Sequence, residues 1–268
     1  MKTLLAEHLA NWSLAIDGQP IQTPTALLQP VIWQGQAAML KISTASEEIE
    51  GYALLRWWAG DGAARVFEQS GPAIVMERSV GSRSLAALSR EENDDEACRI
   101  ICAVVARLHS PRAVPTPALT PLNVSFRALE TSALGGHGVL HPSRQAMTEL
   151  LAHPQDVRCL HGDIHHHNIL DFEARGWLAI DPKGLWGERA FDYANLFCNP
   201  ALEVAGNTAR FLSRVSLVAE HAHLDRQRLL KWILAWAGLS AAWHFEDGTS
   251  AEIALQVAQM ADAALNSV

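Results

Sequence analysis

The chain has little of several features that mark whole classes of protein. Its four cysteines among 268 residues show neither the spacing of a zinc site nor the density of a disulfide-linked secreted domain. Its 21 Lys and Arg against 29 Asp and Glu leave a net charge of −8, without the basic clusters of a nucleic-acid surface. No apolar run reaches the roughly eighteen residues of a membrane span, and Glu7 and His8 interrupt any signal-type core. We therefore predict a cytoplasmic protein with no nucleic-acid or membrane partner.

The pattern along the chain changes near residue 78. Before it, short alternating segments are separated by turn pairs such as Asp17-Gly18 and Gln34-Gly35, and one helix begins at Ser46. After it, helical periodicity predominates. Helices are expected near 93–108, 188–197, 208–222, 225–243 and 250–265. The sequence predicts an α+β fold of two lobes, with residues 1–78 as a small β-rich lobe and 79–268 as a larger, mainly helical lobe.

Two short segments carry the strongest chemical signal. Leu160 to Leu170 reads Leu-His-Gly-Asp-Ile-His-His-His-Asn-Ile-Leu, and Asp181 follows an apolar run that begins at Trp177. Asp163 can orient an attacking hydroxyl as a general base, while Asn168 and Asp181 supply the hard oxygen ligands that Mg²⁺ prefers. An acid, an amide five residues later and a second acid are the parts that phosphoryl transfer from ATP requires. We therefore predict a protein-kinase-like enzyme using ATP and Mg²⁺.

Further residues are predicted to hold the nucleotide. Lys41 lies in an expected strand, where its ammonium must be paired or hydrated, and Glu48 on the following helix is its expected partner. An edge strand with a solvated Lys41 is the alternative. The segment around Met76, Glu77 and Ser79 has the character of a hinge between lobes. Met76 is expected behind the adenine, with the Glu77 carbonyl and the Ser79 amide as its hydrogen-bond partners.

Other side chains admit two interpretations. The histidines at 161, 165, 166 and 167 could form a zinc or di-metal hydrolase site, but no matching second cluster is evident. Trp232, Trp236 and Trp243 fall on one long apolar helix and favour core packing over a ligand platform. Glu188 and Asp192, one turn apart after Asp181, either cap a helix or bind a cationic substrate. Glu246 and Asp247 are weaker candidates for such binding.

The chain resembles the aminoglycoside phosphotransferase family, in particular its streptomycin 6-kinase and hydroxyurea kinase branch. The resemblance is carried by Leu160-His-Gly-Asp163, Arg175-Gly-Trp-Leu-Ala-Ile-Asp181, Phe191-Asp-Tyr-Ala-Asn195 and strings around residues 51–58 and 235–243. It implies Asp163 as catalytic acid/base, Asn168 and Asp181 as Mg²⁺ ligands, and Lys41 on the phosphates. It also implies a small-molecule acceptor, most specifically the 6-hydroxyl of streptomycin, and we expect a monomer.

The chain departs from the family's pattern at three places. His167 stands where Glu is common, Lys183 adds a positive charge beside Asp181, and residues 120–155 match poorly. A Gly-x-Gly-x-x-Gly loop is missing as well, so Thr23-Pro24-Thr25 would cover the phosphates. Two alternatives stay open. One is a kinase of hydroxyurea or another small hydroxylated metabolite, and the other is a nucleotide-binding pseudokinase.

Overall fold

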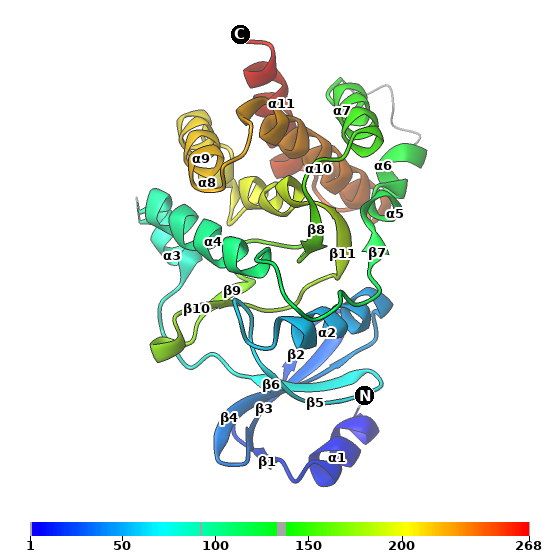
Figure 1. The fold of residues 1–268 in the computed structure, drawn as a ribbon, viewed down its shortest axis with the longest axis vertical. Coiled ribbons are helices and arrows are strands. Elements are labelled where there is room, and N and C mark those ends of the chain that lie inside the picture. The colour runs from blue at the N-terminus through cyan, green and yellow to red at the C-terminus, as the bar shows by residue number, and fades with distance from the viewer. Residues whose placement is uncertain (1, 92, 133–137, 268) are drawn as a thin grey trace.

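The computed structural model describes residues 2–91, 93–132 and 138–267. Figure 1 shows a small sheet-containing lobe joined to a larger helical lobe. In the small lobe the elements are α1 (Lys2–Asn11), β1 (Ala15–Ile16), β2 (Ile21–Gln22), β3 (Ala26–Trp33), β4 (Gln36–Ser43), α2 (Ser46–Trp58), β5 (Val66–Ser70) and β6 (Ala73–Glu77). This architecture confirms the predicted α+β, bilobal kinase-like fold, whereas the exact lobe boundary at residue 78 stays a prediction.

The small lobe is an antiparallel sheet in the order β1-β3-β4-β6-β5, with β2 also paired to β3. The predicted hairpin at Gln34-Gly35 is confirmed, since both residues have positive φ and Trp33 pairs with Gln36. Such backbone conformations match the twist of the flanking strands. The expectation for Asp17-Gly18 was wrong, because β1 and β2 both pair with β3 rather than with each other.

Alternation along β4 divides its side chains between two environments. Leu40 and Ile42 join the apolar cluster on the face covered by α1. Lys41, between them, points to the opposite face, where α2 packs, because successive strand residues project to opposite sides of a sheet. The alternation of side chains along β4 therefore places Lys41 on the side of the sheet that faces α2 and the large lobe.

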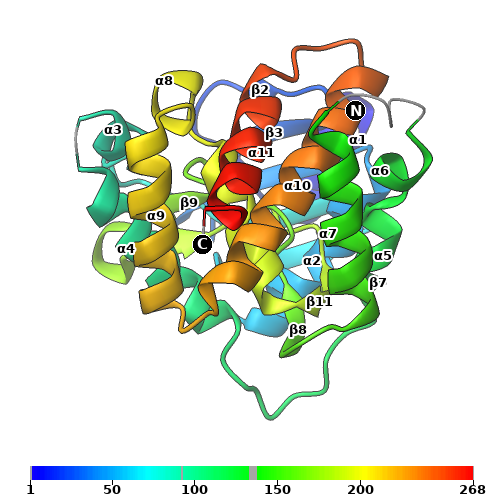
Figure 2. The ribbon, with the colours of Figure 1, turned by 90° about the horizontal axis from the view of Figure 1, so that it is seen from above.

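The large lobe is built on helices that lie side by side in Figure 2. The central one is α10 (Arg226–Glu246), which packs between α7 (Leu140–Ala152) and α11 (Glu252–Leu265). The remaining helices are α3 (Leu85–Arg90), α4 (Asp94–Leu108), α5 (Leu122–Ser125), α6 (Arg127–Thr131), α8 (Leu202–Ala205) and α9 (Thr208–His221). The helices expected near 93–108, 208–222, 225–243 and 250–265 are confirmed. That near 188–197 is instead two short 3₁₀ turns, η2 (Arg189–Tyr193) and η3 (Asn195–Cys198).

Two small sheets lie between the main sheet and these helices. One is the hairpin of β9 (Ile169–Asp171) and β10 (Trp177–Ala179), joined through the short 3₁₀ helix η1 (Glu173–Arg175). The other has the order β7-β11-β8, formed by Thr120–Pro121, Leu185–Glu188 and Val157–Leu160. The two chemically distinctive sequence segments lie at the ends of these strands, at the junction of the lobes. No helix of the described residues is long and apolar enough to cross a membrane.

Candidate active site

The β9–β10 hairpin brings the predicted metal ligands together. Ala179 pairs with Ile169, so Asn168 and Asp181 flank the same end of the hairpin, and the Ile180 amide donates to the Asn168 carbonyl at 2.9 Å. Asp181 has a φ of +57°, a conformation that Asp tolerates better than most residues. A separation of thirteen residues in sequence thus becomes direct adjacency in space.

Asp163 projects from the loop after β8 and is held by two amides. Asn195 Nδ2 donates to one carboxylate oxygen at 2.8 Å, and Asn168 Nδ2 donates to the other at 3.2 Å. Asn168 Nδ2 also donates to the Asp163 carbonyl at 2.9 Å. The Asp163 side chain retains 26% exposure, so the carboxylate is oriented and still accessible. An oriented, accessible carboxylate suits proton removal from a hydroxyl.

Lys41 connects the small lobe to the metal-ligand segment. Its Nζ lies 2.8 Å from Glu48 Oε2 and 2.9 Å from Asp181 Oδ1, and the lysine is almost fully buried. Burial raises the pKa of Glu48, but hydrogen bonds from Lys41, Thr25 and Ser43 outweigh it and lower the pKa to about 2. The structure therefore brings Lys41, Glu48 and Asp181 together, and the contact of Lys41 with phosphates stays a prediction.

The donor set at Asn168 and Asp181 fits a hard divalent cation. The Asn168 amide nitrogen is occupied as a donor, which leaves its oxygen to act as a ligand, and Lys41 engages Asp181 through Oδ1 alone. Mg²⁺ commonly takes one or two protein oxygens and completes its shell with water and phosphate. Within the described ranges, no three His, Cys, Asp or Glu side chains converge as metal ligands.

The histidines of the loop point in different directions. His161 Nε2 donates to the Ile180 carbonyl at 2.8 Å, and its Nδ1 accepts from the Asp163 amide at 3.2 Å. Burial lowers the pKa of His161, which favours the neutral ring that these two bonds require. His166 is also buried, which lowers its pKa to about 3. His161 therefore supports the loop from behind, and its ring is fully occupied in doing so.

Asp192 is buried behind the same loop. Its Oδ1 accepts from the Gly162 amide at 2.7 Å, and its Oδ2 accepts from the His161 amide and from His109 Nε2 at 2.9 and 2.8 Å. Both oxygens are engaged and the residue is 1% exposed. The expectation that Asp192 binds a substrate cation is therefore revised, because this carboxylate fixes the backbone that carries Asp163.

The side chains of the predicted hinge fasten it to the large lobe. Ser79 Oγ donates to the Asp171 carbonyl at 2.6 Å, and the Glu77 carboxylate accepts from Arg175 and from the Arg65 amide. Met76 is buried on the inner side of β6. These contacts hold the hinge in place, and the contacts of Met76, Glu77 and Ser79 with adenine stay a prediction.

A cavity of about 770 Å³ opens in front of Asp163. Its lining includes Gly162, Phe191 and, from α10, Trp236 and Trp243. The two indoles meet edge to face, and Trp243 is 37% exposed. The interpretation of these tryptophans as core therefore holds for Trp232, which is fully buried, and is wrong for Trp243.

The same cavity has more acidic than basic side chains. Besides Asp163, its lining contains Glu47 and Glu50 of α2 and Asp247 at the end of α10, against the cations Arg127 and Lys183. Glu50 accepts from Thr120 Oγ1 at 3.0 Å, and Glu47 lies 3.4 Å from Lys183 Nζ. The poorly matching part of the sequence also contributes to the lining, through Thr120, Val124, Ser125, Arg127 and Ala128. A polar, cationic small molecule would fit such a lining.

Comparison with known proteins places the chain in a family. The family model described as aminoglycoside/hydroxyurea antibiotic resistance kinase matches residues 11–248. The chain belongs to this family. The chain is similar to a streptomycin 3''-kinase of Klebsiella pneumoniae, with 46% identity over 90% of the chain and 92% of the relative. It is 32% identical to a streptomycin 6-kinase of Streptomyces griseus over 96% of the chain and 87% of the relative.

Solved structures show the same fold at low sequence identity. The aminoglycoside phosphotransferase APH(4)-Ia superposes with a TM-score of 0.71 at 14% identity, covering 99% of this chain and 98% of that one. The family model and the sequence relatives confirm the predicted family and enzyme class, an ATP-dependent small-molecule kinase. The acceptor and the individual residue roles are questions for the proposal below.

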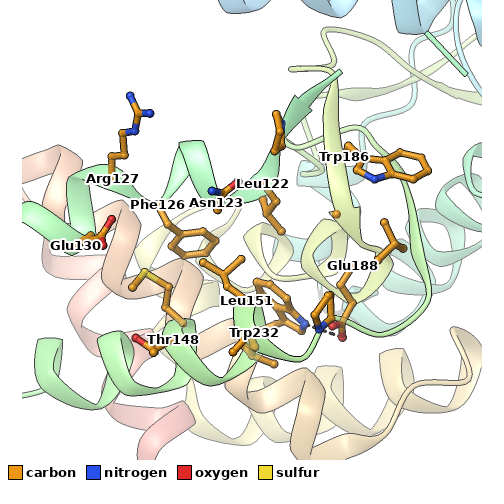
Figure 3. A pocket seen from close by; sticks show the side chains of 17 residues that line it. Leu122, Asn123, Phe126, Arg127, Glu130, Thr148, Leu151, Trp186, Glu188 and Trp232 are labelled. Carbon is orange, nitrogen blue, oxygen red and sulfur yellow. Dashed lines mark hydrogen bonds between the residues drawn. The ribbon is translucent and has the colours of Figure 1, made fainter. Parts of the chain in front are cut away.

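Glu188 lines a different pocket. This pocket has a volume of about 580 Å³, and Figure 3 shows Glu188 beside Trp232 and on the far side of Phe126 from Arg127. Arg228 binds both of its carboxylate oxygens at 2.6 Å, and Trp232 Nε1 donates at 2.8 Å. The expectation that Glu188 binds substrate is also revised, because this buried ion pair joins β11 to α10.

Several site residues were not recognised from the sequence. In the sequence, Asn195 stands out only as the last residue of the segment Phe191–Asn195 that resembles the family. In the structure it orients Asp163 and accepts from Trp236 Nε1 at 3.1 Å. Asn195 follows the turn that contains Phe191, and nothing in the local sequence marks it as a residue that contacts Asp163. The acids Glu47 and Glu50 were not recognised either, because helix periodicity alone does not show which exposed side of a helix borders a cavity.

Proposed function

We propose that this kinase transfers the γ-phosphoryl group of ATP to a hydroxyl of streptomycin or a closely related aminoglycoside. The observation that carries the proposal is the acid-rich, indole-walled cavity that contains Asp163. Streptomycin bears guanidinium groups, which bind carboxylates through paired hydrogen bonds and stack on indole faces. Glu47, Glu50 and Asp247 replace Glu188 and Asp192 as the acids expected to bind these groups.

Within this proposal, each residue has a defined task in the reaction. Asn195 and Asn168 hold the Asp163 carboxylate so that it can accept the proton of the acceptor hydroxyl. Asn168 and Asp181 would hold Mg²⁺, which supplies positive charge to the β- and γ-phosphates when bound. Lys41 is positioned for the α- and β-phosphates, and Glu48 keeps it in place. Met76, Glu77 and Ser79 would receive the adenine.

The hydroxyl that is modified belongs to the proposal as well. From the sequence we expected the 6-hydroxyl, but the relative that is 46% identical is named a 3''-kinase and the 6-kinase relative is 32% identical. We therefore propose the 3''-hydroxyl. The convergence of Lys41, Asp163 and Asp181 favours an active enzyme over a pseudokinase. The size and acidity of the cavity favour an aminoglycoside over hydroxyurea.

Mass spectrometry of streptomycin incubated with the protein, ATP and Mg²⁺ tests this function. We expect the mass of one added phosphoryl group, and phosphorus–proton correlation in NMR should place it at the 3'' position. Choline, homoserine and hydroxyurea serve as comparison acceptors, and the Asp181→Ala variant should give no product. Glu50→Gln and Asp247→Asn should raise the KM for streptomycin and leave the KM for ATP unchanged. Consumption of ATP with choline but not with streptomycin would refute the proposal.

A further inference from the structure

A glycine stands in the buried middle of α2, where a side chain would be expected. Gly51 lies between Glu50 and Tyr52, on the side of the helix that faces the large lobe. Glycine inside a helix costs about 1 kcal/mol relative to alanine. A close contact that only glycine permits would account for its presence at this position.

The contact is made by the backbone that follows Asp181. A Cβ at position 51 would lie 1.8 Å from the Pro182 carbonyl oxygen and 2.8 Å from its carbonyl carbon. From the other side, a Cβ at Gly184 would lie 3.3 Å from the Gly51 Cα. Helix α2 and residues 182–184 therefore touch backbone to backbone, and even a methyl group cannot enter without displacing one of them.

The two touching segments carry the two carboxylates that bind Lys41. Glu48 precedes Gly51 by three residues, about one helical turn, and Asp181 precedes Pro182 directly. Lys41 bridges Glu48 at 2.8 Å and Asp181 at 2.9 Å. The contacts form a closed ring that runs from Lys41 to Glu48, along α2 to Gly51, across to Pro182 and back through Asp181.

We propose that Gly51 is a positioning residue for catalysis. Its missing side chain sets the spacing between α2 and the segment 181–184 at which Lys41 reaches both carboxylates. A larger residue at 51 would separate the two segments and move Asp181 with Pro182. A misplacement of about 1 Å at a reacting centre can cost roughly 10²-fold in rate. The inference rests on the proposed function, in which Asp181 holds Mg²⁺ on the nucleotide.

The test compares nucleotide binding with and without Mg²⁺ in the full chain. In the wild type, Mg²⁺ should increase the affinity for ATP, as measured by calorimetry. In Gly51→Ala, this Mg²⁺-dependent gain should shrink by at least about tenfold, which corresponds to 1.4 kcal/mol, while binding without Mg²⁺ changes little. A purely structural role would lower the melting temperature and leave the Mg²⁺-dependent gain of the folded fraction intact.

Ala53→Ser is the matched control in the same helix. Ala53 is exposed, so a small change there alters helix propensity without meeting residues 182–184. This variant should keep the wild-type Mg²⁺ dependence. In a Glu48→Gln background, Gly51→Ala should add less than it does alone, because both changes act on the ring around Lys41.

Gly184→Ala provides the same test if Gly51→Ala fails to fold. The new Cβ would press on Gly51, but the residue also has a φ of +71°, which strains any alanine there. Gly176→Ala controls for the strain, since Gly176 has a φ of +74° and nothing within 4 Å of its added Cβ. Gly184→Ala should lose the Mg²⁺-dependent gain and Gly176→Ala should keep it.

The possible results separate this inference from the proposed function. A wild type that binds ATP no better with Mg²⁺ would contradict the proposed function itself. If the wild type shows the gain and folded Gly51→Ala shows the same gain, only the positioning role of Gly51 is refuted. Full additivity of Gly51→Ala with Glu48→Gln would refute it as well.

Discussion

The two loops that carry Asp163 and Asp181 and the segment that carries Glu188 and Asp192 use carboxylates in different ways. Asp163 and Asp181 keep 26% and 31% of their side-chain surface exposed, whereas Glu188 and Asp192 are 3% and 1% exposed. All four carboxylates accept hydrogen bonds from protein groups, but the exposed pair also keeps surface that a ligand can reach. The buried Asp192 in turn fixes the backbone that carries Asp163.

The comparison also explains how the loop stays in place without a regular element. Residues 161–167 lie between two short strands, yet Asp192 accepts from two successive amides of this stretch. Buried amides need partners, and a carboxylate that serves two of them fixes the local backbone. The position of Asp163 therefore depends on Asp192, an acid 29 residues further along the chain.

The largest effect that we expect comes from replacing the exposed acid. Asp163→Asn should keep the fold and nucleotide binding but lower kcat by about 10²–10⁴-fold, because the amide cannot accept the hydroxyl proton. Steady-state kinetics with streptomycin, alongside a thermal melt, checks both parts. An unchanged kcat would remove Asp163 from the role of base.

Replacing the buried acid should affect stability first. Asp192→Ala would leave the amides of His161 and Gly162 and the ring of His109 without an acceptor, at a cost of about 2–5 kcal/mol. For a chain of this size the melting temperature should fall by about 5–10 °C. Calorimetric melts of Asp192→Ala and Asp163→Asn should therefore differ clearly. Equal melting temperatures for the two variants would contradict the distinction between buried structural acids and accessible acids.

Glu48 extends the comparison to a third case, because it is largely buried and also contacts Lys41 in the candidate active site. Its pKa is lowered from 4.5 to about 2, so its ionised form stabilises the fold fully above about pH 5. That contribution is lost as the pH falls towards 2, when the carboxyl becomes protonated in the folded state. The loss of stability of the wild type on acidification should therefore be steeper than that of Glu48→Gln.

Melting temperatures measured from pH 6 down to pH 2 test this difference. Glu203→Gln is a suitable control, since Glu203 is 64% exposed and pairs with Arg90 only at the surface. It should follow the wild-type curve. Parallel curves for wild type and Glu48→Gln would show that the Lys41–Glu48 pair contributes no pH-dependent stability.

Local patterns in the sequence were sufficient to predict the candidate catalytic motif and most of the elements. The spacing of Asp163, Asn168 and Asp181 and the strand position of Lys41 follow from residue types and periodicity, which do not depend on distant contacts. The strong helices after residue 93 were readable for the same reason. Segments with few internal signals were not, such as α1 and the 3₁₀ turns after Glu188, because docking against other elements determines their conformation.

The sequence by itself determined the order and spacing of two acids and an amide, local properties that predict a nucleotide site. Tertiary structure alone decided which other acids remain available, since that depends on partners far along the chain. Arg228 occupies Glu188, and the loop amides occupy Asp192, while Glu47, Glu50 and Asp247 are left along a cavity. Burial and hydrogen bonding depend on the neighbours of an acid and not on the acid itself. They therefore decide whether a carboxylate stabilises the fold or stays accessible for binding.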